Sequence, residues 1–108
     1  MEACLDDVDL SGAILNNTDL WRAELSRARL EGAKLVCADL RSANLNGANL
    51  TTAEFSGAKL AYANMTSATS NGIVLLGATY NSSTQLPAGV DPEQSGMQAD
   101  RSEDDGSG

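Results

Sequence analysis

The sequence predicts a repetitive fold of short extended segments, in which the chain turns a corner after every five residues. The first observation behind this prediction is a column of large apolar residues at every fifth position. The second is a column of small residues, mostly alanine, two positions before each member of the first. The third is that both columns stay in register over sixteen units, from position 5 to position 80, without an insertion. The first column comprises Leu5, Leu10, Leu15, Leu20, Leu25, Leu30, Leu35, Leu40, Leu45, Leu50, Phe55, Leu60, Met65, Leu75 and Tyr80, with Ser70 as its polar break.

A period of five fits neither ordinary secondary structure. On an α-helix, five residues advance by about 500°, so successive leucines would lie about 140° apart and scatter around the axis. On a straight strand, an odd period sends alternate leucines to opposite faces. A chain that turns once per five residues keeps every leucine inside, with the alanine two positions earlier on the same face. The other three positions carry polar residues and glycine, which are typical of solvated turns.

The repeating unit is illustrated by Ala38-Asp39-Leu40-Arg41-Ser42 and Ala48-Asn49-Leu50-Thr51-Thr52. These units resemble the repeats of the pentapeptide repeat proteins, and the resemblance covers about three-quarters of the chain. The resemblance implies an all-β fold, a right-handed quadrilateral β-helix in which four pentapeptides make one square coil. Residues 1–82 would then form about four coils, stacked at a sheet spacing of ~4.8 Å.

This geometry makes residues twenty positions apart vertical neighbours. Three such pairs combine opposite charges, namely Asp9 with Arg29, Lys34 with Glu54, and Asp39 with Lys59. Exposed pairs of this kind contribute only about 0–1 kcal/mol each to stability. They therefore test the register of the coils more than they stabilise the fold.

The composition changes after the last repeat, and we expect residues 83–97 to cap the open end of the solenoid. Asp91 has the character of a helix N-cap and Pro92 suits a first helical position, so a short helix could begin here. Three apolar residues would lie over the core, namely Leu86, Val90 and Met97. This segment also resembles the C-terminal tail of many cyanobacterial pentapeptide repeat proteins. Those tails favour phenylalanine where this chain has Leu86 and Val90.

The two ends differ in character. Residues 98–108 are polar, acidic and rich in glycine and serine, which predicts a disordered tail. At the other end, Met1 and Glu2 precede the first repeat directly, so the chain is a piece of a longer protein or its first coil is protected in another way. Residues 1–20 carry five acids and no base. We expect repulsion between these acids to keep the protein monomeric at low salt. When the charges are screened or neutralised, two chains could associate end to end through their N-terminal coils.

Composition excludes several classes of function. The 108 residues carry a formal net charge of −8, one Trp, two Tyr, one Phe and no histidine. The absence of histidine removes the usual general base and the commonest metal ligand, so we predict no enzymatic activity, no catalytic residue, no cofactor and no metal site. No apolar run approaches the ~18 residues of a membrane span and no signal peptide opens the chain, which predicts no membrane insertion. No basic patch suggests direct nucleic-acid binding.

The two cysteines are expected to be free thiols. The coil places Cys4 and Cys37 on different faces, too far apart for the short Cα separation of a disulfide. Free thiols favour a reducing compartment and hence the cytoplasm. A lumen or the periplasm stays open if a targeting segment was removed.

One candidate interaction patch consists of Trp21, Arg22, Arg41 and Tyr62. Trp21 follows an inward leucine, so its ring should point outward, beneath Arg41 of the next coil and near Arg22 and Tyr62. The first interpretation is a surface stack that satisfies itself and contributes about 0.5–1 kcal/mol. The second is a small binding patch, because Trp, Tyr and Arg are enriched among residues that dominate interface energetics.

These inferences favour a non-enzymatic structural or protein-interaction module with a core of leucine and alanine, a polar outer surface and a protein partner that the sequence does not name. The alternative, an activity known for some pentapeptide repeat proteins, is a DNA mimic that inhibits or modulates a topoisomerase. Such mimicry needs negative charge along the whole rod, about one charge per 1.7 Å of duplex axis. Here the acids lie at both ends and residues 21–82 are slightly basic, which favours the first function.

Overall fold

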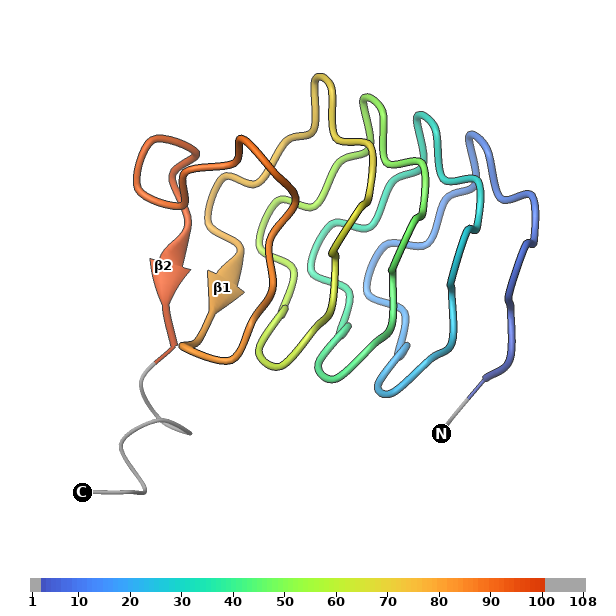
Figure 1. Ribbon diagram of the computed structural model, residues 1–108, viewed down its shortest axis with the longest axis horizontal. Coiled ribbons are helices and arrows are strands. Elements are labelled where there is room, and N and C mark those ends of the chain that lie inside the picture. The colour runs from blue at the N-terminus through green and yellow to red at the C-terminus, as the bar shows by residue number, and fades with distance from the viewer. Residues whose placement is uncertain (1–2, 101–108) are drawn as a thin grey trace.

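The computed structural model describes residues 3–100, which form a stack of square coils (Figure 1). Single-residue parallel bridges occur at every fifth residue from Cys4 to Lys59, and each joins a residue to the one twenty positions later. Twenty residues therefore complete one coil, as in a quadrilateral β-helix. Two longer strands, β1 (Thr79–Tyr80) and β2 (Gln98–Ala99), pair in parallel at the C-terminal end. The described residues contain no helix, and so none that could cross a membrane.

Each corner of the coil is a tight turn that ends in a left-handed residue. The N–H of the small inward residue donates to the carbonyl oxygen three residues earlier, as Ala48 does to Leu45 at 3.0 Å. The residue just before it has a φ of 56–75° at every fifth position from Asp7 to Gly77. Nine of these corner residues are not glycine, and a left-handed conformation costs such a residue roughly 1–3 kcal/mol. Stacking of the coils, and not local preference, therefore imposes the corners.

Gly72 and Gly12 are a matched pair for testing these corners. Both have a φ near 70°, but a Cβ on Gly72 would lie 3.2 Å from Cγ2 of Thr52, whereas a Cβ on Gly12 would meet nothing within 4 Å. We expect Gly72→Ala to lower the free energy of unfolding by about 1–3 kcal/mol, and by more than Gly12→Ala. Denaturant unfolding of the two variants measures the difference. Equal losses would mean that the contact with Thr52 costs nothing.

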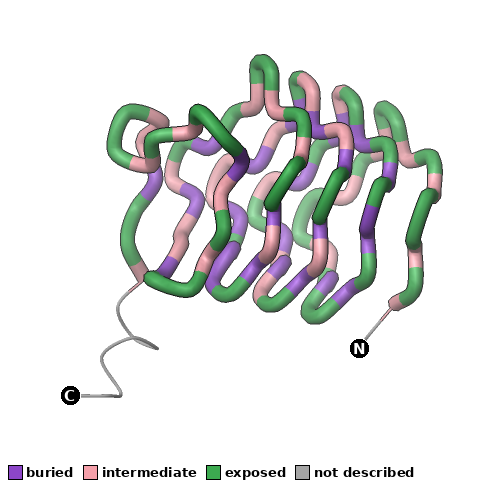
Figure 2. The backbone as a smooth tube through the Cα atoms, in the orientation of Figure 1, coloured by how far each residue is buried: buried purple, intermediate pink, exposed green. Residues whose placement is uncertain are grey.

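Two inward columns fill the interior of the middle coils. Figure 2 shows buried residues recurring along each of these coils. The first coil is more open, since Leu5, Leu10 and Leu15 are only partly buried. Burial of a leucine-sized side chain stabilises by about 1.5–3 kcal/mol, and stacking makes the core continuous. The members of the two columns between positions 23 and 65 are all at most 1% exposed, namely Ala23, Leu25, Ala28, Leu30, Ala33, Leu35, Ala38, Leu40, Ala43, Leu45, Ala48, Leu50, Ala53, Phe55, Ala58, Leu60, Ala63 and Met65.

The predicted register is confirmed, whereas the predicted charge pairs form only in part. Bridges join Asp9 to Arg29, Lys34 to Glu54, and Asp39 to Lys59. Only the second pair makes an ion pair, with Nζ of Lys34 at 3.5 Å from Oε2 of Glu54. The carboxylate of Asp39 instead binds Arg41, two residues along its own coil, at 2.7 Å. This local pair takes the carboxylate that the sequence had assigned to Lys59 of the next coil.

Residues 81–100 form a fifth, irregular coil. Gln85 bridges to Asn64, and Gln98 pairs with Thr79, so separations of twenty-one and nineteen residues replace the regular twenty. The extra residue is accommodated at Asn81, whose side-chain Oδ1 accepts the N–H of Tyr62 at 3.1 Å. A backbone carbonyl makes the equivalent contact in the regular coils. The buried Asn81 side chain thus replaces a peptide group at the start of the last coil.

The expected short helix after Asp91 is wrong. Oδ1 of Asp91 does accept the N–H of Glu93 at 2.9 Å, as an N-cap would. However, Met97 donates its N–H to the carbonyl of Pro92 at 2.9 Å, which closes this segment into a turn. The turn cannot lengthen into a helix because Gln98 must pair with β1 immediately afterwards.

The expected boundary of the tail also differs from the structure. Gln98 donates its N–H to the carbonyl of Ala78 at 2.8 Å, so residues 98–100 belong to the last coil. The rest of the expected disordered tail, residues 101–108, lies outside the described residues. Leu86 and Val90 pack against the core and Met97 is 8% exposed, as expected for a cap.

Candidate functional site

The candidate patch lies at one corner of the square, where one coil passes into the next. Trp21 and Arg41 occupy the same corner position in successive coils, and the buried Ala61 follows in the third. Arg22 and Tyr62 occupy the next position along, where their φ values of 61° and 64° are left-handed. The coil geometry therefore brings the four predicted residues to one edge of the solenoid.

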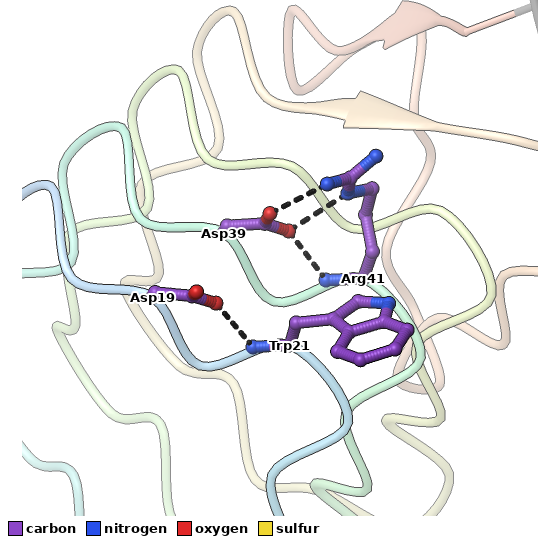
Figure 3. A network of polar contacts seen from close by, with 4 residues as sticks. All are labelled: Asp19, Trp21, Asp39 and Arg41. Carbon is purple, nitrogen blue, oxygen red and sulfur yellow. Dashed lines mark hydrogen bonds and ion pairs between the residues drawn. The ribbon is translucent and has the colours of Figure 1, made fainter. Parts of the chain in front are cut away.

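The aromatic residues of this patch are well exposed. The side chains of Trp21 and Tyr62 are 40% and 41% exposed. Cζ of Arg22 lies 5.3 Å from the centroid of the Trp21 ring, a cation–π contact worth about 0.5–1 kcal/mol at an exposed site. Figure 3 shows the Trp21 ring beneath Arg41, as the sequence predicted. The guanidinium over the ring, however, is that of Arg22.

Two aspartates fix the backbone of the corner (Figure 3). Oδ1 of Asp19 accepts the N–H of Trp21 at 3.1 Å, and Oδ1 of Asp39 accepts the N–H of Arg41 at the same distance. The carboxylate of Asp39 also receives Nε and an NH2 group of Arg41 at 2.9 and 2.7 Å. This bidentate contact holds the guanidinium in one orientation.

Asp19 and Asp39 were not singled out in the sequence as part of the patch. The signal that could have found them is an Asp or Asn two positions before a corner residue, because such side chains accept the N–H two residues further on. In the regular coils four other pairs make the same contact, namely Asp9–Ser11, Asn44–Asn46, Asn49–Thr51 and Asn64–Thr66. Where Asp or Asn stands between the small and the large inward residue, it therefore shapes the corner as well as the surface.

The hydrogen bonds from Arg41 hold the pKa of Asp39 below its ordinary value of 3.8. A group whose pKa is lower in the folded state stabilises the fold above its unfolded pKa, and this stabilisation is lost as the pH falls through the folded pKa. We expect Asp39→Asn to lower the free energy of unfolding at pH 7 by about 0.5–1 kcal/mol. The melting temperature should also fall less steeply in the variant than in the wild type as the pH is lowered from 7 to 2. Parallel pH profiles would contradict this assignment.

Other candidate chemistry from the sequence is distributed differently. Oδ1 of Asp7 accepts Nε of Arg27 at 2.9 Å, which lowers the pKa of that carboxyl. Within residues 3–100, no group of three or more His, Cys, Asp and Glu side chains is placed to hold a metal ion. Cys4 and Cys37 are exposed free thiols.

A comparison with protein families identifies the repeats. Two overlapping segments, residues 3–36 and 33–69, match the family model described as pentapeptide repeats. Together these segments cover more than half of the chain. No curated protein matches the sequence.

Two solved structures show the same fold over most of the chain. A pentapeptide repeat protein from Nostoc PCC 7120 is 33% identical with a TM-score of 0.66, and the match covers 89% of this chain and 85% of that one. A pentapeptide repeat protein from the thylakoid lumen of Arabidopsis thaliana is 31% identical with a TM-score of 0.75, and the match covers 92% of this chain and 64% of that one. The expected right-handed quadrilateral β-helix is confirmed, and the chain belongs to the pentapeptide repeat family.

Proposed function

We propose that this protein is a non-enzymatic protein-interaction module, and that its contact surface is the corner patch of Trp21, Arg22, Arg41 and Tyr62. The observation that carries the proposal is the exposure of about 40% of both aromatic side chains on a backbone that is held in place. Aromatic and arginine side chains of this kind dominate the energetics of protein interfaces.

The rigidity of the corner supports the proposal. The N–H groups of Trp21 and Arg41 are held by the carboxylates two residues earlier, and the coils are joined by backbone hydrogen bonds such as that from Arg22 N–H to the Arg41 carbonyl at 2.9 Å. A surface that is already ordered loses little conformational entropy when it binds. The interior from Ala23 to Met65 is filled by side chains, so binding has to occur on the outside.

The test is affinity capture from the source organism with immobilised protein. We expect the double variant Trp21→Ala/Tyr62→Ala to lose a specific partner by at least tenfold, because loss of residues that dominate an interface costs about 2 kcal/mol or more. Leu76→Ala is the matched control, since this leucine is 66% exposed at a different corner of the square. If the wild type, the double variant and the control capture the same proteins, the corner residues only contact one another and bind no partner.

The alternative function, DNA mimicry toward a topoisomerase, has a direct test. Bases interrupt the acids of the described rod, among them Arg27, Arg29, Lys34 and Lys59. A continuous line of negative charge is what a duplex presents. We therefore expect supercoiling by DNA gyrase to be unchanged in the presence of excess protein. Inhibition that depends on protein concentration would instead support mimicry.

For the cellular location we propose a reducing compartment, such as the cytoplasm. The proposal is supported by two exposed thiols that form no disulfide in the structure. A lumenal location, like that of the Arabidopsis relative, is the alternative. Subcellular fractionation with an antibody against the protein distinguishes the two.

A further inference from the structure

We propose that the N-terminal coil, residues 3–20, is a docking edge for a basic extended segment of a partner protein. The partner segment would carry Lys or Arg at outward positions and leucine-sized side chains at inward positions. This coil stands at the end of the stack, away from β1 and β2 (Figure 1). The inference concerns a different surface from the corner patch and does not depend on it.

The backbone of the first coil offers an unpaired edge on each face of the square. In the second coil, the bridging residues donate their N–H groups to carbonyls of the first, as Glu24 does to Ala3 at 2.7 Å and Arg29 does to Val8 at 2.8 Å. The equivalent N–H groups of the first coil have no acceptor among residues 3–100. They belong to Cys4, Asp9, Ile14 and Asp19. Such an edge is a template for a further strand.

The apolar end of the core is open at the same place. Leu5, Leu10 and Leu15 are only partly buried, whereas the leucines stacked on them are 0% exposed. Ile14 is 72% exposed beside them. A further coil or strand with leucine-sized inward residues would cover this surface as each coil of the protein covers its neighbour.

The opposite end of the solenoid is different because its chain partly covers it. Gln85 bridges to Asn64, and β2 pairs with β1, so two faces there are closed by strand pairing. Between these paired strands, the apolar Leu86 and Val90 pack on the core. Among the described residues, only the N-terminal end leaves all four faces of the coil without a paired strand.

Charge identifies the kind of segment that fits this edge. The described part of the first coil carries Asp6, Asp7, Asp9 and Asp19 and no base. Only Asp7 forms an ion pair with a described residue, Arg27 of the second coil. The other three carboxylates accept backbone N–H groups, which orients them, and form no ion pair within residues 3–100.

The second coil shows which kind of side chain pairs with the acids of the first coil. It places Arg27 against Asp7 at 2.9 Å and Arg29 in the bridge to Asp9. A segment with bases at the same outward positions would meet these acids from the other side. Opposite charges placed across neighbouring strands stabilise the pairing.

At low salt and neutral pH, a second copy of the chain does not fit the edge. Two N-terminal coils would bring their acids together, and like charges across strands are destabilising. The C-terminal coil, residues 81–100, carries Asp91, Glu93 and Asp100 and no base, so head-to-tail stacking also opposes acids. The charges of this edge therefore fit a basic segment better than either described end of a second copy.

The test uses a synthetic peptide of four Ala-Lys-Leu-Ser-Gly units and the full chain at low salt. We expect the peptide to protect the backbone N–H groups of Cys4, Asp9, Ile14 and Asp19 from hydrogen exchange, as followed by NMR. Its Kd should rise at least about tenfold between 0.02 M and 0.5 M salt, because exposed charges are screened. Control peptides carry Glu in place of Lys, or Ser in place of Leu, and neither should protect these groups.

Two charge variants complete the design. The variant Asp9→Asn/Asp19→Asn keeps the side-chain oxygens that accept N–H groups but removes two charges. It should therefore raise the Kd of the Lys peptide by about fivefold or more. Asp91→Asn/Glu93→Gln removes two charges from the other end and should leave the Kd unchanged. Three results would each overturn the proposal. The Glu or Ser peptide could bind as well as the Lys peptide, the N–H groups could become protected as the protein concentration rises without any peptide, or protection could be confined to the C-terminal coil.

Discussion

Replacing Phe55 by alanine is expected to lower the free energy of unfolding by about 3–5 kcal/mol, the range typical of a buried phenylalanine. Phe55 is a large, fully buried side chain in the stack with Leu35 below it and Leu75 above it, which are 0% and 2% exposed. Backbone hydrogen bonds on both sides, from Leu35 to Glu54 and from Phe55 to Val74, both at 2.7 Å, prevent the coils from closing around the cavity.

Denaturant unfolding measures this loss, with Leu76→Ala as the control. Leu76 is 66% exposed, so its truncation should change the free energy of unfolding by no more than about 0.5 kcal/mol. A solenoid transmits such a defect to neighbouring coils, because each repeat is stabilised mainly by its neighbours. Similar losses in the two variants would mean that the large-residue column is not the core.

The second expectation is that the protein is a monomer at low salt and associates end to end as salt rises. Two N-terminal coils facing each other would oppose the acids of both chains, including Asp6, Asp9 and Asp19. The Debye length falls from about 30 Å at 0.01 M salt to about 3 Å at 1 M, so this repulsion disappears while the apolar end remains. Light scattering across a salt series gives the mass directly.

Lowering the pH should also promote this association. The ion pair with Arg27 lowers the pKa of Asp7, and the backbone N–H of Ser11 lowers that of Asp9. Both carboxylates therefore lose their charge at a lower pH than an ordinary aspartate does. We expect little association at pH 5 and more below pH 3.8. A stable dimer at pH 7 and 0.01 M salt would show that the acids do not protect the edge.

The regular coils could be predicted closely from the sequence. The five-residue period, with leucine inward and alanine two positions earlier, correctly predicted buried side chains such as Leu40 and Ala48, which are 0% exposed. The register between coils followed from the resemblance to four-sided pentapeptide coils, and the bridges between residues twenty apart, from Cys4–Glu24 onward, agree with it. This succeeded because each position in the coil repeats one environment, so a single pattern determines sixteen units.

The corner patch was predicted only in outline. The period places Trp21, Arg22, Arg41 and Tyr62 at one edge, but it does not decide which guanidinium contacts the ring. Arg41 is drawn away because Asp39 lies two residues before it and accepts both its backbone and its side-chain donors. Cζ of Arg22 lies 5.3 Å from the centroid of the Trp21 ring. Competition between nearby partners settles this choice, and periodicity contains no information about it.

The five-residue period by itself determined that the chain turns once per unit with leucine and alanine inside, and the resemblance to pentapeptide repeat proteins supplied the four-sided coil and its register. Only the tertiary structure decided the path of residues 81–100. A capping signal at Asp91 favoured a helix there, yet Gln85 and Gln98 pair with the coil below. The strand edge of the fourth coil offers hydrogen bonds that an isolated turn of helix cannot replace, so the last segment follows the solenoid.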